Sequence, residues 1–326
     1  MSFRHATFEH TGTPEGVVRV VDAKSQPLTA DSVRIGMQFA PINPADINYL
    51  QGTYGKKATL PATPGMEGTG TVLEIGSDVR SFAEGDQVIL HNHIGCWSQE
   101  LTVPQTQVVR LAAAIDPHQA AMLRVNPTTA WRLLTGYHKL QTGDWIVQNA
   151  ANSGVGLAVI QLAKQLGVNT LNLVRRNSAL EICHAVGAEH VLLDKKGLQS
   201  PSQLETEPPL AFNAVGGDSA LRLMSLLAPK GTHITYGAMS RQPLKVPNKF
   251  LIFKEIQLRG LWVSRWLNDM CSQDRQDLFD RLGEAVRNGH LQLPIDTVYP
   301  LDQIARAVLH AQTPQRCGKV MIDLRS

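Results

Sequence analysis

The sequence has few cysteines and no long apolar run. Across its 326 residues, no stretch approaches the roughly 20 apolar residues that a membrane-spanning helix needs, and the N-terminus lacks the apolar core of a secretion signal. No two cysteines form a C-x-x-C pair, so neither a disulfide framework nor a zinc knuckle is indicated. We therefore expect reduced cysteines, no membrane, and a cytoplasmic location, or an organelle if a presequence has been removed. The cysteines are Cys96, Cys183, Cys271 and Cys317.

The sequence also lacks a strong excess of charge. The formal net charge is +3 and the isoelectric point is near 8.7, without a block of Lys and Arg or an interleaved aromatic stripe. Proteins that bind nucleic acid usually show such clusters, so we expect no nucleic-acid partner. A small anionic ligand fits the mild basicity better.

A glycine-poor turn in the middle of the chain is its most informative feature. The segment from Ile146 to Lys164 joins an apolar strand to an amphipathic helix through small residues. Aligned on Gly156, a complete G-x-G-x-x-G fingerprint would need glycines where Ala151 and Ser153 stand. The backbone N–H groups at the helix start still suit a dinucleotide pyrophosphate, as in the first turn of a Rossmann fold. An ordinary βα turn is the alternative interpretation.

Two arginines end the next apolar stretch. Arg175 lies 19 positions after Gly156, where an NAD-preferring site usually has Asp or Glu. Arg175 and Arg176 instead suit a 2′-phosphate, because a guanidinium matches phosphate oxygens and stays charged. The pair predicts NADPH as cofactor; a solvated basic pair that closes a strand is the alternative.

The chain changes character near residue 118. Residues 1–117 contain short alternating runs with Gly and Pro, which predict a compact β-rich domain. From 118 to 265, apolar strands alternate with helices, which indicates a parallel sheet covered on both faces. A helix at Leu278–Val286 and a final strand follow, and we expect residues 266–326 to pack on the first domain. The expected strands of the central domain are Trp145–Gln148, Leu171–Val174, His190–Leu193, Ala211–Val215, His233–Tyr236 and Ile256–Leu261.

Several motifs resemble the medium-chain dehydrogenase/reductase superfamily. They are Asn43-Pro-Ala-Asp46, Gly65-Met-Glu-Gly-Thr-Gly70, Gly76-Ser-Asp-Val79, Gly85-Asp-Gln-Val88 and the turn described above. Within the superfamily, the mitochondrial-type trans-2-enoyl-thioester reductases are the most similar, through Ile47-Asn-Tyr-Leu-Gln-Gly-Thr-Tyr-Gly55, Val125-Asn-Pro-Thr-Thr-Ala130 and Arg259-Gly-Leu-Trp-Val-Ser-Arg-Trp266. The resemblance implies a GroES-like catalytic domain built from both chain ends, a central Rossmann domain, and often a homodimer joined through the Rossmann sheets.

The residues at the metal positions argue against zinc. Zinc enzymes of this superfamily use Cys, His or Glu at positions that fall here on Asn43 to Asp46, Met66 and Asn126, and only Glu67 beside them has a ligating side chain of that kind. A catalytic zinc needs about three protein ligands. His91 and His93 share a strand spacing, but we interpret them as ordinary strand residues. We expect no metal.

Without a Lewis acid, reduction of a conjugated C=C bond is the reaction that the fold supports best. Hydride addition at Cβ places negative charge on the carbonyl oxygen, and Cα then needs a proton. Tyr54 stands between Gly52 and Gly55, and the resemblance implies that this tyrosine is the proton donor. Without the resemblance, a loop tyrosine packed against the domain interface would be the simpler interpretation.

The resemblance also implies a set of cofactor contacts. Ala238 replaces a glycine of the family, and Arg176 is displaced by one position from the second phosphate-binding arginine, so Arg175 transfers more directly. Trp262 is implied beside the nicotinamide and the acyl pocket, whereas we expect Trp266 in the core or an interface. The implied contacts are Asn126, Asn152, Ser153, Gly154, Val155, Arg175, Arg176, Tyr236, Gly237, Ala238, Met239, Leu261, Trp262, Val263 and Lys319.

The sequence thus predicts an NADPH-dependent reductase of trans-2-enoyl thioesters, carried by CoA or by acyl carrier protein. An NADPH:quinone or general enone reductase is the alternative enzyme. A non-catalytic, crystallin-like NADPH-binding protein is the alternative of another class.

Overall fold

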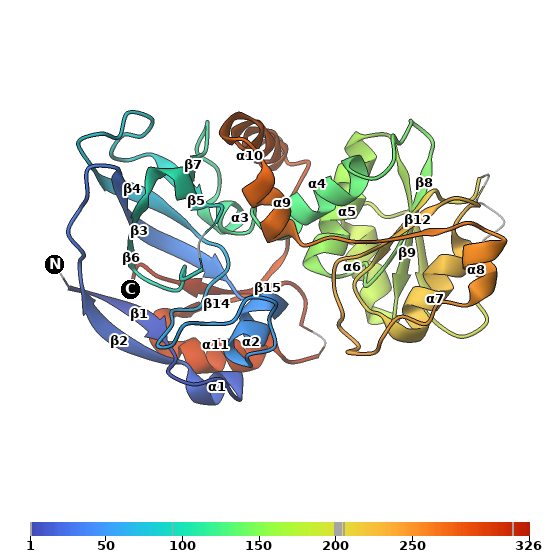
Figure 1. The fold of residues 1–326 in the computed structure, drawn as a ribbon, viewed down its shortest axis with the longest axis horizontal. Helices are drawn as coiled ribbons and strands as arrows, with labels where there is room; N and C mark the ends of the chain where they lie inside the picture. Colours follow the sequence, from blue (N-terminus) through green and yellow to red (C-terminus); the bar gives the residue numbers. More distant parts are fainter. Residues whose placement is uncertain (1, 93, 199–203, 205, 315) are drawn as a thin grey trace. The chain divides into compact units, whose positions relative to one another are not determined.

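The chain folds into two compact units, each of which is described by itself. The computed structural model describes residues 2–92, 94–198, 204, 206–314 and 316–326 (Figure 1). Unit 1 comprises residues 1–125 and 267–326, and unit 2 comprises residues 126–266. The first division lies after the expected 117, because α3 (Pro117–Ala121) belongs to unit 1: the Gln119 side chain donates to the Leu293 carbonyl at 3.0 Å and accepts from its N–H at 2.9 Å. No helix among the described residues is both long and apolar enough to cross a membrane.

Unit 1 is built around a mixed seven-stranded sheet in its described part. The order is β14-β15-β3-β4-β5-β7, with β6 also paired to β3, and β1 and β2 form a separate antiparallel pair. Buried residues alternate with partly exposed ones along most of β3, as expected for a strand that covers a core with one face. The strands are β1 (Ser2–Thr7), β2 (Arg19–Lys24), β3 (Ser32–Pro41), β4 (Thr69–Ile75), β5 (Gln87–Leu90), β6 (Glu100–Pro104), β7 (Val108–Arg110), β14 (Ile295–Pro300) and β15 (Lys319–Asp323).

The C-terminal segment completes this sheet. Strand β15 pairs antiparallel with β3, with Met321 opposite Pro41, and parallel with β14. Helix α10 (Ser272–Arg287) extends beyond the expected Leu278–Val286 at both ends. Its first turn is capped by the Cys271 sulfur, which accepts from the Asp274 N–H at 3.4 Å. The other helices of unit 1 are α1 (Pro14–Val17), α2 (Pro44–Leu50), α11 (Ile304–Ala311) and the 3₁₀ turns η1 (Gln105–Gln107) and η2 (Leu301–Gln303).

The core of unit 1 contains large side chains with no exposed surface. Trp97 and Phe8 are completely buried, and burial of a side chain such as Phe8 contributes about 1.5–3 kcal/mol. Trp97 packs so closely on Gly65 that a Cβ there would lie 2.6 Å from its ring. Gly65 also has a φ of +111°, so glycine is required at this position for two independent reasons.

The described part of unit 2 has a six-stranded parallel sheet in the order β10-β9-β8-β11-β12-β13. This is the doubly wound Rossmann order, in which the direction of winding reverses between β8 and β11. The strands are β8 (Trp145–Asn149), β9 (Asn169–Val174), β10 (His190–Leu193), β11 (Leu210–Asn213), β12 (Thr232–Thr235) and β13 (Gln257–Gly260). The helices are α4 (Asn126–Thr135), α5 (Gly154–Gln165), α6 (Ser178–Ala185), α7 (Gly217–Leu226), α8 (Asn248–Ile252) and α9 (Val263–Asp269), the last of which crosses the second division.

Each expected strand of unit 2 overlaps an observed one, and the expected fold class is confirmed. The ends differ where polar side chains intervene. Strand β11 stops at Asn213 rather than Val215, because the Asn213 side-chain oxygen accepts from the N–H groups of Val215 at 3.1 Å and Gly216 at 3.0 Å and turns the chain. Tyr236 similarly lies just beyond the end of β12.

A buried histidine makes unit 2 sensitive to acid. His233 on β12 has no exposed surface, and neither of its ring nitrogens has a hydrogen-bond partner. Burial lowers the pKa of His233 from 6.5 to about 4, because the charged ring would lose its hydration. Between pH 6.5 and about 4, His233 is therefore protonated in the unfolded chain but neutral in the folded chain. The free energy of unfolding consequently decreases as the pH falls through this range.

We expect the free energy of unfolding to decrease between pH 6.5 and about 4, with about 3 kcal/mol of that loss due to His233. His233→Leu should remove this part of the loss, because leucine cannot take up the proton. Urea unfolding at pH 7.5 and pH 4 measures the difference, and His10→Leu at an exposed position is the control. An equal acid sensitivity of His233→Leu and wild type would contradict the assignment. His91, whose pKa burial also lowers to about 4, accounts for a further part in both proteins.

Candidate active site

The glycine-poor turn lies at the carboxyl edge of the parallel sheet, between β8 and α5. Ser153 caps the helix, and its hydroxyl accepts from the Gly156 N–H at 3.2 Å. Ala150 has a φ of +48°, a left-handed conformation that an alanine adopts at a cost in strain. The backbone therefore makes the bend of a glycine-rich turn although two of its glycines are replaced.

Gly156 is the glycine that the packing of this turn requires. A Cβ at Gly156 would lie 2.4 Å from the Ala151 carbonyl oxygen. Helix α5 can therefore approach the end of β8 only with glycine here, which is the role of the third glycine in a dinucleotide fingerprint. Asn152, Ser153, Gly154 and Val155, the residues implied at the pyrophosphate, form the helix entry.

Arg175 and Arg176 follow the end of β9, at the same edge of the sheet. Arg175 is exposed and Arg176 is half-buried, and among the described residues neither forms an ion pair. Their guanidinium groups are therefore not committed to a carboxylate of unit 2. This leaves them available for an anionic ligand.

The remaining implied contacts of unit 2 follow β12 and β13. The Tyr236 hydroxyl is buried without a hydrogen-bond partner of good geometry, although Ser153 lies near enough to offset part of the rise in its pKa that burial causes. Met239 and Trp262 are exposed, by 52% and 46%. Arg132 stacks on the half-buried Trp266 ring at 5.1 Å. Gly237, Ala238, Leu261 and Val263 lie beside these residues in the chain.

A buried network of polar side chains lies at the carboxyl edge of the unit 2 sheet. It was not predicted from the sequence. The Asn149 amide, at the end of β8, donates to Asn213 and to Ser219, both at 2.8 Å, and accepts from the Ala214 N–H at 2.8 Å. Ser219 in turn donates to Asp194 at 2.5 Å. The network ties the ends of β8, β10 and β11 to α7. The sequence signal that could have predicted this network is an asparagine at the end of an apolar run, which occurs at both Asn149 and Asn213.

Tyr54 lies in unit 1, on the loop after α2. It is half-buried, and its ring meets the Tyr49 ring edge to face, with centroids 6.4 Å apart. The Tyr54 N–H donates to the Asn48 carbonyl at 3.1 Å, which fixes the backbone. Gly52 has a φ of +73°, whereas Gly55 has open space where a Cβ would be. The backbone on either side of Tyr54 is therefore shaped by the hydrogen bond to Asn48 and by the positive φ of Gly52.

A cluster of buried charged and amide groups occupies unit 1 near the start of β15. The Asn43 side chain donates to Glu67 Oε1 at 2.8 Å and accepts from the Lys319 ammonium. Glu67 Oε2 accepts from the Val125 N–H at 2.7 Å. Val125 directly precedes the buried Asn126, which begins α4 of unit 2. Of this cluster, Lys319 was among the implied contacts, whereas Asn43 and Glu67 had been considered only as metal positions.

Asp46 supports the same cluster through the backbone. Its two oxygens accept from the N–H groups of Asn43 and Met66, both at 2.7 Å. Burial raises the pKa of Asp46 to about 7 and also raises the pKa of Glu67, while it lowers the pKa of Lys319 to about 8. Arg124 closes the cluster by donating to the carbonyls of His91 at 2.8 Å and Met66 at 2.5 Å.

The arrangement does not offer a metal site in the described part of the chain. No group of three His, Cys, Asp or Glu side chains is placed to hold an ion there. Each oxygen of Asp46 and Glu67 already accepts from an N–H group. His91 Nε2–H donates to the Thr106 carbonyl at 2.6 Å, and His93 lies outside the described residues.

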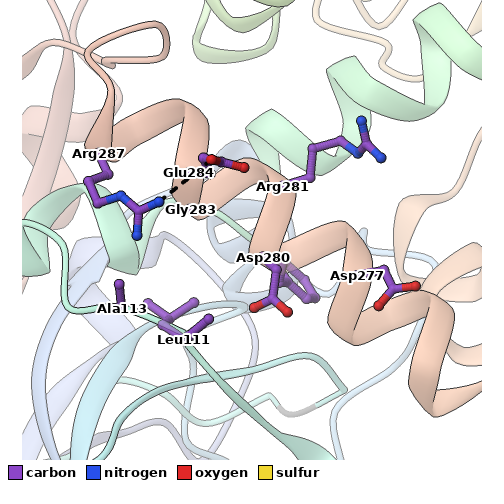
Figure 2. A pocket seen from close by; sticks show the side chains of 10 residues that line it. Leu111, Ala113, Asp277, Asp280, Arg281, Gly283, Glu284 and Arg287 are labelled. Carbon is purple, nitrogen blue, oxygen red and sulfur yellow. Dashed lines mark ion pairs between the residues drawn. The ribbon is translucent and has the colours of Figure 1, made fainter.

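Unit 1 also has a hollow that is separate from the buried cluster of Asn43, Glu67 and Lys319. It has a volume of about 410 Å³ and lies between α10 and the segment after β7. Figure 2 shows Asp277 and Asp280 on the helix side and Leu111 and Ala113 opposite them. Glu284 and Arg287 pair at 3.6 Å along the helix. None of the implied site residues lines it.

The structure thus gathers the implied residues into two sets. In unit 2, the turn after β8, the arginines after β9 and the segments after β12 and β13 all lie at the carboxyl edge of one parallel sheet, where α/β proteins bind their ligands. In unit 1, Lys319 joins the cluster of Asn43 and Glu67, and Tyr54 lies on the loop after α2.

Two family models match different parts of the chain. Residues 29–113 match the model of the alcohol dehydrogenase GroES-like domain, and residues 154–282 match that of the zinc-binding dehydrogenase. The mitochondrial enoyl-[acyl-carrier-protein] reductase of Xenopus tropicalis is 39% identical over 96% of this chain and 93% of its own.

Solved structures with the same fold come from two kinds of reductase. A putative NADPH:quinone reductase from Bacillus thuringiensis has a TM-score of 0.91 and 26% identity over 99% of both chains. Etr1p in complex with NADP and crotonyl-CoA has a TM-score of 0.87 and 25% identity, over 99% of this chain and 100% of its own. Etr1p also matches as a heterodimer with Etr2p, a mitochondrial 2-enoyl thioester reductase from Candida tropicalis, with a TM-score of 0.88, 25% identity and the same coverage.

The identity to the frog enzyme extends over nearly the whole of both chains, and the fold is that of the solved reductases in both units. The chain belongs to the medium-chain dehydrogenase/reductase superfamily, among the relatives of the mitochondrial enoyl-[acyl-carrier-protein] reductases.

Proposed function

We propose that the protein catalyses the NADPH-dependent reduction of trans-2-enoyl thioesters, with hydride added at Cβ and a proton at Cα. The observation that carries the proposal is the full-length similarity to enoyl reductases, one of which has been solved with NADP and crotonyl-CoA. The position of Tyr54 on a glycine-flanked loop of unit 1 supports it, because the reaction needs a proton donor.

The carboxyl edge of the unit 2 sheet is the proposed NADPH site. The N–H groups at the start of α5 would hold the pyrophosphate, and Arg175 and Arg176 the 2′-phosphate. The unpaired Tyr236 hydroxyl beside Ser153 supports a polar ligand there, since a buried hydroxyl without a partner is costly. The other proposed contacts are Asn126, Asn152, Gly154, Val155, Gly237, Ala238, Met239, Leu261, Trp262, Val263 and Lys319.

NADPH supplies the hydride when it is bound. Tyr54 would then give its phenolic proton to Cα and relieve the negative charge on the thioester enolate. Trp262, with 46% of its surface exposed, would line the acyl pocket. The acyl group of the substrate would be carried by CoA or by acyl carrier protein. The complex of Etr1p with crotonyl-CoA supports CoA, and the similarity to an enoyl-[acyl-carrier-protein] reductase supports the carrier protein.

A quinone reductase is the second candidate, and the similarity to a putative NADPH:quinone reductase favours it. A quinone takes its protons from water, so this reaction would not need Tyr54. A crystallin-like NADPH-binding protein would bind the cofactor and transfer no hydride. For location, the mitochondrial relatives support an organelle, and the cytoplasm stays the other proposal.

We expect Tyr54→Phe to leave the dissociation constant of NADPH nearly unchanged and to lower turnover of crotonyl-CoA by roughly 10²- to 10⁴-fold, the usual contribution of a positioned acid. NADPH oxidation followed at 340 nm measures the turnover. Tyr299→Phe is the matched control, because that phenol bonds to His310 at 3.0 Å elsewhere in unit 1. Unchanged turnover in Tyr54→Phe would remove this tyrosine from the mechanism, and quinone turnover alone in the wild type would favour the second candidate.

We expect Arg175→Ala to weaken NADPH binding by about 10- to 100-fold, the value of a hydrogen bond to a charged group, and to leave NADH binding unchanged. Fluorescence titration with both cofactors measures the ratio. Arg176→Ala should have a smaller effect, because it is half-buried and displaced from the family position. An equal loss for NADPH and NADH would mean that Arg175 does not contact the 2′-phosphate.

We propose further that two copies of the chain form a homodimer through β13. This strand is the last in the sheet order, its residues are all exposed, and the nearby Ile252 and Phe253 are exposed by 63% and 82%. An open edge beside apolar side chains is a surface that proteins usually cover, and a second copy would continue the sheet.

We expect the wild type to elute as a dimer of the 35.7-kDa chain and Phe253→Glu to elute as a monomer, because the charge would be buried without a partner. Size-exclusion chromatography with light scattering measures the mass. Leu73→Glu is the control, since Leu73 is 50% exposed on unit 1. A monomeric wild type, or a dimeric Phe253→Glu, would contradict this interface.

A further inference from the structure

Lys319 is a buried cation with only part of its hydrogen-bonding capacity used. The residue is 7% exposed, and among the described residues its ammonium group donates to a single acceptor, the side-chain oxygen of Asn43. An ammonium group carries three N–H donors. Burial of a charge with unfilled donors is costly, and such groups are commonly retained for a ligand.

Asn43 links this cation to a carboxylate. Its amide nitrogen donates to Glu67 Oε1 at 2.8 Å while its oxygen accepts from Lys319, so the two partners together determine which way the amide faces. No direct ion pair joins Lys319 and Glu67 within 4 Å in the described part of the chain. The amide therefore spans two opposite charges and holds the ammonium at a fixed place.

Glu67 is itself held rigidly. It has no exposed surface, and its second oxygen accepts from the Val125 N–H at 2.7 Å. With one oxygen on the backbone and the other on Asn43, the carboxylate cannot rotate toward another partner. Its negative charge, when present, therefore stays at a fixed position near Lys319.

The other charges around this cluster are Asp46, Arg124 and Arg316. Asp46 favours the charged form of Lys319, whereas Arg316 disfavours it, and Arg124 stabilises the charge of Glu67. Asp296 pairs electrostatically with Arg316, and the buried Cys96 thiol and His91 lie beside Arg124. Of these neighbouring charges, Glu67 stabilises the protonated form of Lys319 the most.

We propose that Asn43 and Glu67 are positioning residues for the reduction: they keep the Lys319 ammonium charged and oriented, so that its remaining N–H donors bind an oxygen of the reactants that carries negative charge. This inference rests on the proposed function. The oxygen belongs either to the cofactor or to the thioester enolate, and binding and turnover distinguish the two.

Glu67→Gln tests the proposal without emptying the core. Glutamine can still accept from the Val125 N–H, but its amide nitrogen would face that of Asn43, and the negative charge is lost. Glu100→Gln is the matched control, because Glu100 is a carboxylate of unit 1 that is 8% exposed and lies 3.7 Å from Arg34 instead. Lys319→Met removes the ammonium, and Asp46→Asn tests the other buried carboxyl group.

Two quantities are measured from pH 6 to 10 for each protein: kcat/KM for crotonyl-CoA and the dissociation constant of NADPH by fluorescence. Lys319 has a pKa of about 8, so its deprotonation should appear as a basic limb. We expect Glu67→Gln to move this limb to lower pH by about one unit or more, and Glu100→Gln to leave it in place. Lys319→Met should abolish the limb and lower the affected quantity by about 10- to 100-fold. The double variant Glu67→Gln/Lys319→Met should behave as Lys319→Met does.

The two measured quantities distinguish the possible acceptors. If NADPH binding weakens as the pH rises through the basic limb, the oxygen belongs to the cofactor. If only kcat/KM falls there, the oxygen belongs to the enolate. A limb that persists in Lys319→Met but is lost in Asp46→Asn, or an unmoved limb in Glu67→Gln, overturns the proposal. If the wild type reduces no thioester, the proposed function has failed. NADPH binding then decides the inference alone, since a shifted limb supports it and an unshifted one overturns it.

Discussion

The pairing of β15 with β3 is the contact on which unit 1 depends. It joins the end of the chain to a strand formed almost 300 residues earlier in the sequence, and it brings Lys319 to Asn43. Such a contact costs much chain entropy to form, and the sheet hydrogen bonds and the buried core around Ile322 and Ile35 offset that cost. Lys319 is buried because it lies on β15, which pairs with β3 inside the sheet of unit 1.

Unit 2 rests on a different constraint, the alignment of parallel strands. Because all six strands of its sheet point the same way, segments as distant as Ser153 and Tyr236 end at one edge. The Asn149 network then holds the strand ends together with side-chain hydrogen bonds, where the backbone ladder has stopped. A fully satisfied polar network makes such an edge rigid, and a rigid edge can bind a long ligand with little loss of entropy.

The sequence predicted the local features of both units well. The alternation of apolar runs located all six strands of unit 2, since a strand buried on both faces reads as a short apolar run. The strand ends were missed at Val215 and Tyr236, because the side chain of Asn213 stops β11 and no periodicity records that hydrogen bond. The sequence predicted a division after residue 117, whereas the first segment of unit 1 ends at Val125. The difference arises because the Gln119 side chain, which ties α3 to unit 1, bonds to Leu293 far along the chain.

The sequence by itself determined the alternation of strands and helices, the bend before α5 and the basic pair after β9, because each depends on neighbouring residues. Only the tertiary structure decided that Asn43, Glu67 and Lys319 form one buried cluster. Burial and charge proximity are properties of residues far apart in the chain, so the lowered pKa of Lys319 and the raised pKa of Glu67 arise only once β15 has paired with β3.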